Sequence, residues 1–303
     1  MTAPPAHAAL RHLSLTVTRR LDGLLHGQHL GLRAGPGSEP GDARLYQPGE
    51  DDVRTMDWAV TARTTHPHVR DPIADRELAT WTLLDLSPTM DFGTAHAQKR
   101  DVAISTLAAV AHLTHHIGDR NGTHVLRNGH LTRSPAATNH NAHLAHARAL
   151  TAPLPPDPGH TTLATALTDL ARTRPRRGLR VIISDFLDTP TTPHTQPSWQ
   201  TPLHHLSARH QTLAIEILDP RELDLPAIGL VTMSDPTTGR TRHVHLTPDL
   251  QHRYAHAARQ QRTAIRDAIR TAGATHLTLR TDRDWILDIA RHATLHRTSP
   301  HRR

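Results

Sequence analysis

The chain has 303 residues, of which 36% are hydrophobic and only 3% are aromatic. This length suits one large α/β domain with a smaller extension, and the composition requires a core built from aliphatic side chains. There is no cysteine, so disulfides, thiolate metal sites and cysteine nucleophiles are all excluded.

Charge and hydropathy favour a cytoplasmic protein without a transmembrane segment. No apolar run approaches the roughly 18 residues that span a bilayer, and residues 1–10 lack a signal-peptide pattern. The formal net charge is +7, with 28 histidines. The basic residues are spread along the chain except in the tail at 292–303, so nucleic acid is not the expected partner.

The first 74 residues are expected to form an N-terminal extension. The apolar spacing of residues 14–25 predicts a helix, and the glycine-rich stretch 31–41 predicts a loop. That loop lacks the Lys-Ser/Thr ending of a phosphate-binding loop. Further on, Trp58 is a candidate aromatic anchor. Ion pairs are expected between the basic and acidic residues around it: Arg54, Arg63 and Arg70 with Asp51, Asp52, Asp57 and Asp71.

From residue 78 strands and helices alternate, which predicts a mostly parallel sheet with helices on both faces. We predict strands at 78–84, 179–183, 213–218 and 276–279, a short hairpin at 123–131 around Asn128-Gly129, and an edge hairpin at 230–246. Predicted helices cover 97–116, 161–172, 199–209, 248–271 and 285–290. This predicts an α/β domain over 75–295 and a basic, disordered tail at 296–303.

Oxygen-bearing side chains follow the buried strands. Asp85, Ser87 and Thr89 come after the first strand, Asp185 follows the second, and Thr161 opens a helix between them. Ligands of open parallel sheets gather at the carboxyl ends of the strands. Carboxylates and hydroxyls without thiolates suit Mg²⁺, with Mn²⁺ as the alternative ion. Thr162 competes with Thr161, because either threonine could cap the helix.

These five residues resemble the metal-ion-dependent adhesion site of von Willebrand factor A domains. Asp85, Ser87 and Thr89 match its first element, Thr161 its second and Asp185 its third. Thr89 stands where the family has serine, which keeps a hydroxyl group. The resemblance implies that the carboxylates often act through water while the hydroxyls bind the ion directly.

A longer resemblance begins at Tyr46-Gln47-Pro48-Gly49-Glu50-Asp51-Asp52 and continues through Trp58, Asp75-Arg76-Glu77 and Asp91-Phe92-Gly93. It is similar to the signature of the bacterial family called domain of unknown function 58, and Leu218-Asp219-Pro220-Arg221-Glu222 extends it. The resemblance implies a von Willebrand factor A-like, non-enzymatic adaptor or co-chaperone of a MoxR-type AAA+ ATPase. The ion would bind an acidic group of a partner, and the client protein is unidentified.

Three alternatives stay open. A Mg²⁺-dependent phosphoester hydrolase would use Asp85, although such loops carry a second aspartate where Ser87 stands. The basic tail could bind nucleic acid, in which case salt would weaken binding steeply. His112, His115 and His116 share one helix face but lack the His-Glu-x-x-His pattern of a zinc site.

Overall fold

The computed structural model describes residues 17, 20–21, 43–47, 56–64, 66–70, 79–114, 120–137, 150, 155, 157–173, 178–187, 196–235 and 239–297. The chain divides into a larger unit, Met1–Arg33 with Leu78–Arg303, and a smaller unit, Ala34–Glu77. The predicted boundary at residues 74–75 falls in the segment 71–78, which lies outside the described residues, and stays a prediction. No helix within the described ranges combines the length and the apolar character that crossing a bilayer requires.

The smaller unit contains a short antiparallel pair, β1 (Ala43–Leu45) with β2 (His68–Arg70), and the helix α2 (Trp58–Thr64). Asp57 caps α2, because its carboxylate accepts the N–H groups of Ala59 and Val60 at 3.0 and 3.1 Å. Trp58 is 68% exposed, so it does not pack into a core within this unit, and its role as an anchor stays a prediction. The Arg63 side chain donates to the Ala59 carbonyl; Asp51, Asp52, Arg54 and Asp71 lie outside the described residues.

The larger unit is built on a six-stranded sheet in the order β10-β7-β6-β3-β4-β5. Its strands are β3 (Ala79–Leu86), β4 (Arg120–Arg127), β5 (His130–Ala137), β6 (Leu179–Ser184), β7 (Gln211–Leu218) and β10 (Thr275–Arg280). All neighbouring pairs are parallel except β4 with the edge strand β5. The predicted fold class is confirmed.

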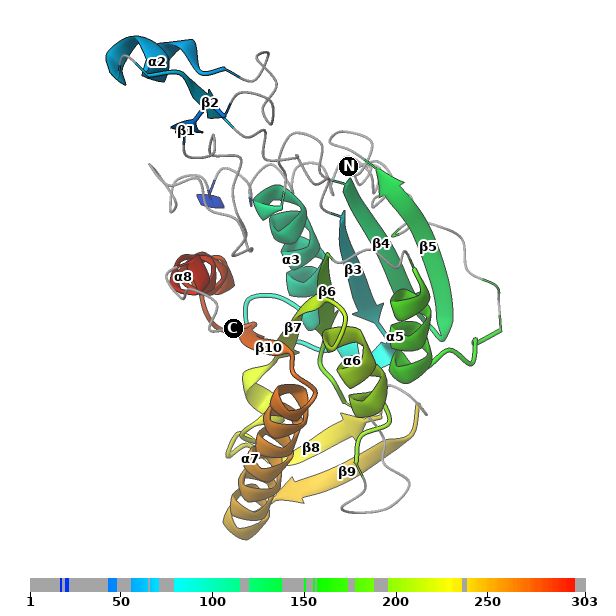
Figure 1. The fold of residues 1–303 in the computed structure, drawn as a ribbon. Coiled ribbons are helices and arrows are strands. Elements are labelled where there is room, and N and C mark those ends of the chain that lie inside the picture. Colours follow the sequence, from blue (N-terminus) through cyan, green and yellow to red (C-terminus); the bar gives the residue numbers. More distant parts are fainter. Residues whose placement is uncertain are drawn as a thin grey trace, which may run out of the picture. The chain divides into compact units, whose positions relative to one another are not determined.

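Helices cover both faces of this sheet (Figure 1). One face packs against α3 (Lys99–Leu113) and α8 (Trp285–Arg297), with Val17 and Leu21 in the same core. The other face packs against α5 (Leu163–Arg172), α6 (Gln200–Ser207) and α7 (Pro248–Thr271). Because side chains alternate along a strand, each central strand contributes to both cores.

Strand order places the candidate site at a change of chain direction. In the order of the chain, the six strands lie as 6-5-4-1-2-3, so β3 and β6 are neighbours whose connections leave in opposite directions. Open α/β sheets bind ligands outside the carboxyl ends of strands at such a switch point. A separate antiparallel pair, β8 (Gly229–Ser234) with β9 (Thr241–Leu246), follows β7.

Candidate metal centre

Asp85 lies at the carboxyl end of β3, inside the strand rather than after it, because β3 extends to Leu86. Its side chain points to the same face as Ser184 of β6, one step beyond the Leu84–Ile183 register pair. The Ser184 hydroxyl donates to Asp85 Oδ2 at 2.7 Å, and the Ser87 N–H donates to Oδ1 at 2.9 Å. Only 4% of Asp85 is exposed.

Asp85 is a carboxylate in an almost fully buried position. Within the described residues, no Lys, Arg or His side chain forms an ion pair with it. Burial, together with the nearby charge of Asp185, raises the pKa of Asp85 to about 6. The hydrogen bonds from Ser184 and Ser87 oppose that shift only in part.

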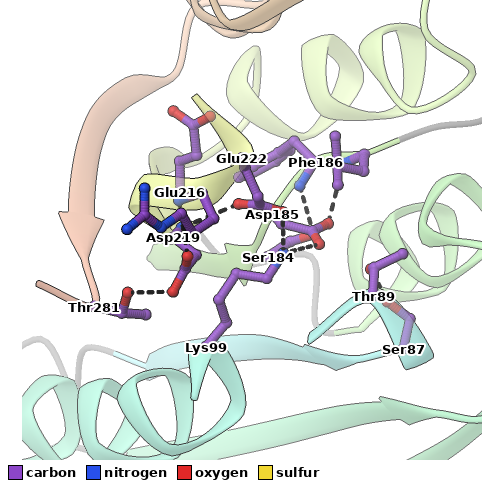
Figure 2. Close-up of polar contacts among 12 residues, drawn as sticks. Ser87, Thr89, Lys99, Ser184, Asp185, Phe186, Glu216, Asp219, Glu222 and Thr281 are labelled. Atoms are coloured by element: carbon purple, nitrogen blue, oxygen red, sulfur yellow. Dashed lines mark hydrogen bonds and ion pairs between the residues drawn. The ribbon is translucent and has the colours of Figure 1, made fainter. Parts of the chain in front are cut away.

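Ser87 and Thr89 bring two further oxygens to this end of β3. Ser87 precedes the short 3₁₀ helix η2 (Pro88–Met90), and its hydroxyl lies 3.1 Å from that of Thr89. The predicted convergence of Asp85, Ser87 and Thr89 is therefore present in the structure. Ser87 and Thr89 are both half-buried, and Figure 2 shows their side chains next to each other.

Thr161 reaches the same edge through backbone contacts. The turn between β4 and β5 lies beside the end of β3, because Leu86 pairs with Arg127. Gly159 N–H donates to Asn128 O and Thr161 N–H donates to Gly129 O, each at 2.9 Å. Thr162, not Thr161, caps α5 with its side chain. Thr161 therefore keeps its hydroxyl out of the cap, although within the described residues that hydroxyl makes no hydrogen bond to the other four candidate ligands.

Asp185 follows β6 and turns toward the opposite face of the sheet from Ser184. Its Oδ1 accepts the Leu187 N–H at 3.1 Å, and its Oδ2 lies 2.8 Å from the ammonium of Lys99. Lys99 is the first residue of α3, and its side chain is fully buried. Figure 2 shows this side chain extending from α3 toward Asp185.

Two more carboxylates continue the network away from Asp85. Lys99 Nζ lies 2.6 Å from Glu222 of the 3₁₀ helix η3 (Pro220–Glu222). Arg262 of α7 pairs with Glu222 at 3.3 Å and with Glu216 of β7 at 3.0 Å, and it also donates to the Asp185 carbonyl. Among the described residues, four carboxylates of this network (Asp85, Asp185, Glu216 and Glu222) share the two cations Lys99 and Arg262, and Glu216 also contacts His276 at 2.9 Å.

Asp219 fixes the neighbouring loops. Its carboxylate accepts the Thr94 N–H and hydroxyl, the Arg221 N–H and the Thr281 hydroxyl, at 2.6–2.9 Å. Although burial raises the pKa of Asp219, these hydrogen bonds lower it more, so the net shift is downward. The segments after β3, β7 and β10 are thereby joined.

The donor set fits a hard divalent cation that binds largely through hydroxyls and water. The described residues contain no group of three or more His, Asp or Glu side chains suited to holding a metal. Asp85, Ser87 and Thr89 nevertheless lie together at one sheet edge, and Asp85 has no counter-charge among the residues that the structure describes. Such a ligand set suits Mg²⁺ better than zinc or copper.

Comparison with known sequences places the chain in a family. The model of the family described as "Protein of unknown function DUF58" matches residues 42–264. The chain belongs to this family. Uncharacterized proteins of Mycobacterium tuberculosis and Mycobacterium bovis are 49% identical over 289 residues, which cover 95% of this chain and 89% of theirs. The predicted resemblance to the DUF58 family is confirmed.

Solved structures with similar folds are distant in sequence. An aerotolerance-related membrane protein from Bacteroides fragilis (TM-score 0.44) and BatB from Bacteroides thetaiotaomicron (TM-score 0.41) are each 12% identical. They cover 72% and 73% of this chain, and 99% and 100% of their own. A von Willebrand factor type A protein from Catenulispora acidiphila is 14% identical, with a TM-score of 0.35, over 73% of this chain and 42% of its own.

Proposed function

We propose that this DUF58 protein is a non-enzymatic interaction module that binds an acidic group of a partner protein through Mg²⁺. Asp85, Ser87, Thr89, Thr161 and Asp185 would hold the ion, with Mn²⁺ as a substitute. The observation that carries the proposal is the buried carboxylate of Asp85 at the switch point, which is close enough to Asp185 to feel its charge and has no cation partner in the described residues.

Ligand number explains why such a site would bind a partner. Two carboxylates and three hydroxyls supply at most five of about six oxygen ligands around Mg²⁺, so water or an external oxygen fills the remaining position. A carboxylate from another protein would supply both an oxygen and a negative charge. The ion therefore acts as a bridge between two acidic surfaces, without a chemical step.

We further propose that the partner is a MoxR-type AAA+ ATPase or a client protein on which that ATPase acts. The family resemblance supports this role of adaptor or co-chaperone. The ATPase would supply the work of remodelling, while this chain would recognise the client.

The test is affinity capture from native lysate by the tagged protein in Mg²⁺, in EDTA, and with Asp85→Asn in Mg²⁺. The proposal expects an ATPase of this class, or a client, to be captured only by the intact protein in Mg²⁺. The same proteins in all three samples would show that the metal centre is not the recognition surface. Turnover of a phosphoester by purified protein in Mg²⁺ would instead favour an enzyme.

A further inference from the structure

Lys99 is the one lysine of a chain that otherwise carries 34 arginines. It is also fully buried, which is rare for a lysine unless the ammonium is paired. Its Nζ lies 2.8 Å from Asp185 Oδ2 and 2.6 Å from Glu222 Oε1. The lysine therefore sits between a candidate metal ligand and the first residue of the network behind it.

The local helix does not explain this position. Lys99 is the first residue of α3, where the helix dipole favours negative rather than positive charge. Burial also disfavours an ammonium ion and by itself lowers its pKa. The carboxylates of Asp185 and Glu222 outweigh that effect and raise the pKa of Lys99, so the ammonium is held in place by tertiary ion pairs.

We propose that the Lys99 ammonium is a tethered counter-ion that competes with the divalent cation for the charge of Asp185 and so sets the affinity of the metal centre. This inference rests on the proposed metal-dependent function. An ammonium on a flexible stem is a compact point charge, whereas a guanidinium is planar and broader. A lysine can therefore enter a site that has to accommodate a small cation as well.

The charge balance gives the direction of the effect. In the metal-free protein Lys99 compensates Asp185, while Asp85 has no cation among the described residues. An incoming divalent ion gains the attraction of both aspartates but is repelled by the ammonium beside Asp185. Removing the ammonium should tighten ion binding, and it should also weaken the metal-free fold, because Asp185 and Glu222 lose a buried partner.

Glu222 acts in the opposite direction. It shares the ammonium with Asp185, and its other oxygen accepts the Asp219 N–H at 3.0 Å. Without its charge, Lys99 would pair with Asp185 alone and would neutralise it more completely. The Glu222→Gln variant should therefore bind the divalent ion more weakly than the intact protein.

Titration calorimetry with Mg²⁺ at pH 7.5 tests the proposal on four proteins: the intact chain, Lys99→Met, Glu222→Gln and Arg133→Met. Arg133→Met is the control: it removes one positive charge from the ion pair between Arg133 of β5, whose side chain is 58% exposed, and Asp169 of α5. We expect Lys99→Met to bind on the order of tenfold more tightly, and Glu222→Gln several-fold more weakly, as charges a few ångströms apart require. The control should change the affinity by less than about twofold.

Unchanged or weaker binding by Lys99→Met, with the intact chain binding Mg²⁺, would overturn this inference and leave the proposed function standing. If neither the intact chain nor Lys99→Met binds Mg²⁺, the inference and the proposed function are both overturned. If Lys99→Met does not fold, lysine-selective isotope labelling of the intact chain tests the inference instead. Because the chain has a single lysine, its side-chain ammonium gives a single NMR signal. That signal should move on titration with Mg²⁺, and a signal that stays still while the ion binds would contradict the proposal.

Discussion

Asp85 is costly to the metal-free protein. Its carboxyl group has an ordinary pKa of 3.8 and a pKa of about 6 in the folded chain. Below pH 3.8 the group is neutral in both states, so it costs nothing. Between these values the folded state binds more protons than the unfolded state, and stability falls as pH rises. Above pH 6 the full cost is present, unless a cation compensates the charge.

Asp85→Asn should therefore stabilise the metal-free protein at pH 7.5, by on the order of 2 kcal/mol of unfolding free energy. The asparagine keeps an oxygen that can accept the Ser87 N–H. Urea unfolding in EDTA measures the effect, and the advantage should vanish near pH 4. The same substitution should abolish the stabilisation by Mg²⁺. A variant less stable than the intact chain at pH 7.5 would show that Asp85 serves the fold and not an ion.

At the scale of elements, the position of Thr161 depends on a close approach between two glycines. A Cβ on Gly129, whose φ is +70°, would lie 2.1 Å from the Gly159 carbonyl oxygen. The turn between β4 and β5 can thus hold the segment that leads to α5 only if both positions lack side chains. Gly229 has a similar φ of +76°, but nothing lies within 4 Å of a Cβ there. The Gly229→Ala variant therefore measures the free-energy cost of the backbone angle alone, without a clash.

We predict that Gly129→Ala lowers the unfolding free energy by about 2 kcal/mol more than Gly229→Ala, which should cost about 1–2 kcal/mol. The clash displaces the backbone of Thr161, so Mg²⁺ should also bind more weakly to the first variant. Denaturant unfolding and Mg²⁺ titration of the two variants measure these effects. Equal losses of stability and unchanged ion binding would show that the glycine contact does not position Thr161.

Local signals explain which elements the sequence predicts well. The bounds of α7 agree with the prediction because Thr247 caps the helix and Pro248 occupies its first turn. The strands β4 and β5 are longer than predicted, because polar residues such as Asn121 and His124 lie buried inside a central strand. α8 extends to Arg297, beyond the predicted end at residue 290. The pair of β1 and β2 was not predicted, since each has only three residues.

In the candidate site too, the sequence predicts residues that local patterns mark and misses those that tertiary contacts bring together. Asp85, Ser87, Thr89 and Asp185 were found because each follows or ends a buried strand, a pattern visible in sequence. Lys99, Glu222 and Arg262 were missed, since their pairing depends on which elements meet in space. One sequence signal did mark Lys99, because a single lysine among many arginines is unusual.

Over the whole molecule, stability and ion binding should be separable. Leu167 of α5 is fully buried in the core on one face of the sheet, and its aliphatic side chain cannot bind an ion. Leu167→Ala should lower the unfolding free energy by about 2–5 kcal/mol. The stabilisation by Mg²⁺ should persist, at about 2.7 kcal/mol when the ion is a hundredfold above its Kd.

Thermal unfolding of Leu167→Ala with and without Mg²⁺ measures both quantities. The melting temperature should fall in both conditions, while the difference between them stays that of the intact chain. Loss of the Mg²⁺ effect in this variant would mean that the ion acts on the fold in general rather than at the edge of the sheet.

The most direct test of the metal centre is a titration with Mn²⁺ in which electron paramagnetic resonance counts the unbound ion. We predict that the intact chain binds one Mn²⁺ at pH 7.5, that excess Mg²⁺ displaces this ion, and that Asp85→Asn binds none. Absence of bound Mn²⁺ in the intact chain, or equal binding by the variant, would contradict the assignment of Asp85, Ser87, Thr89, Thr161 and Asp185 to a metal centre.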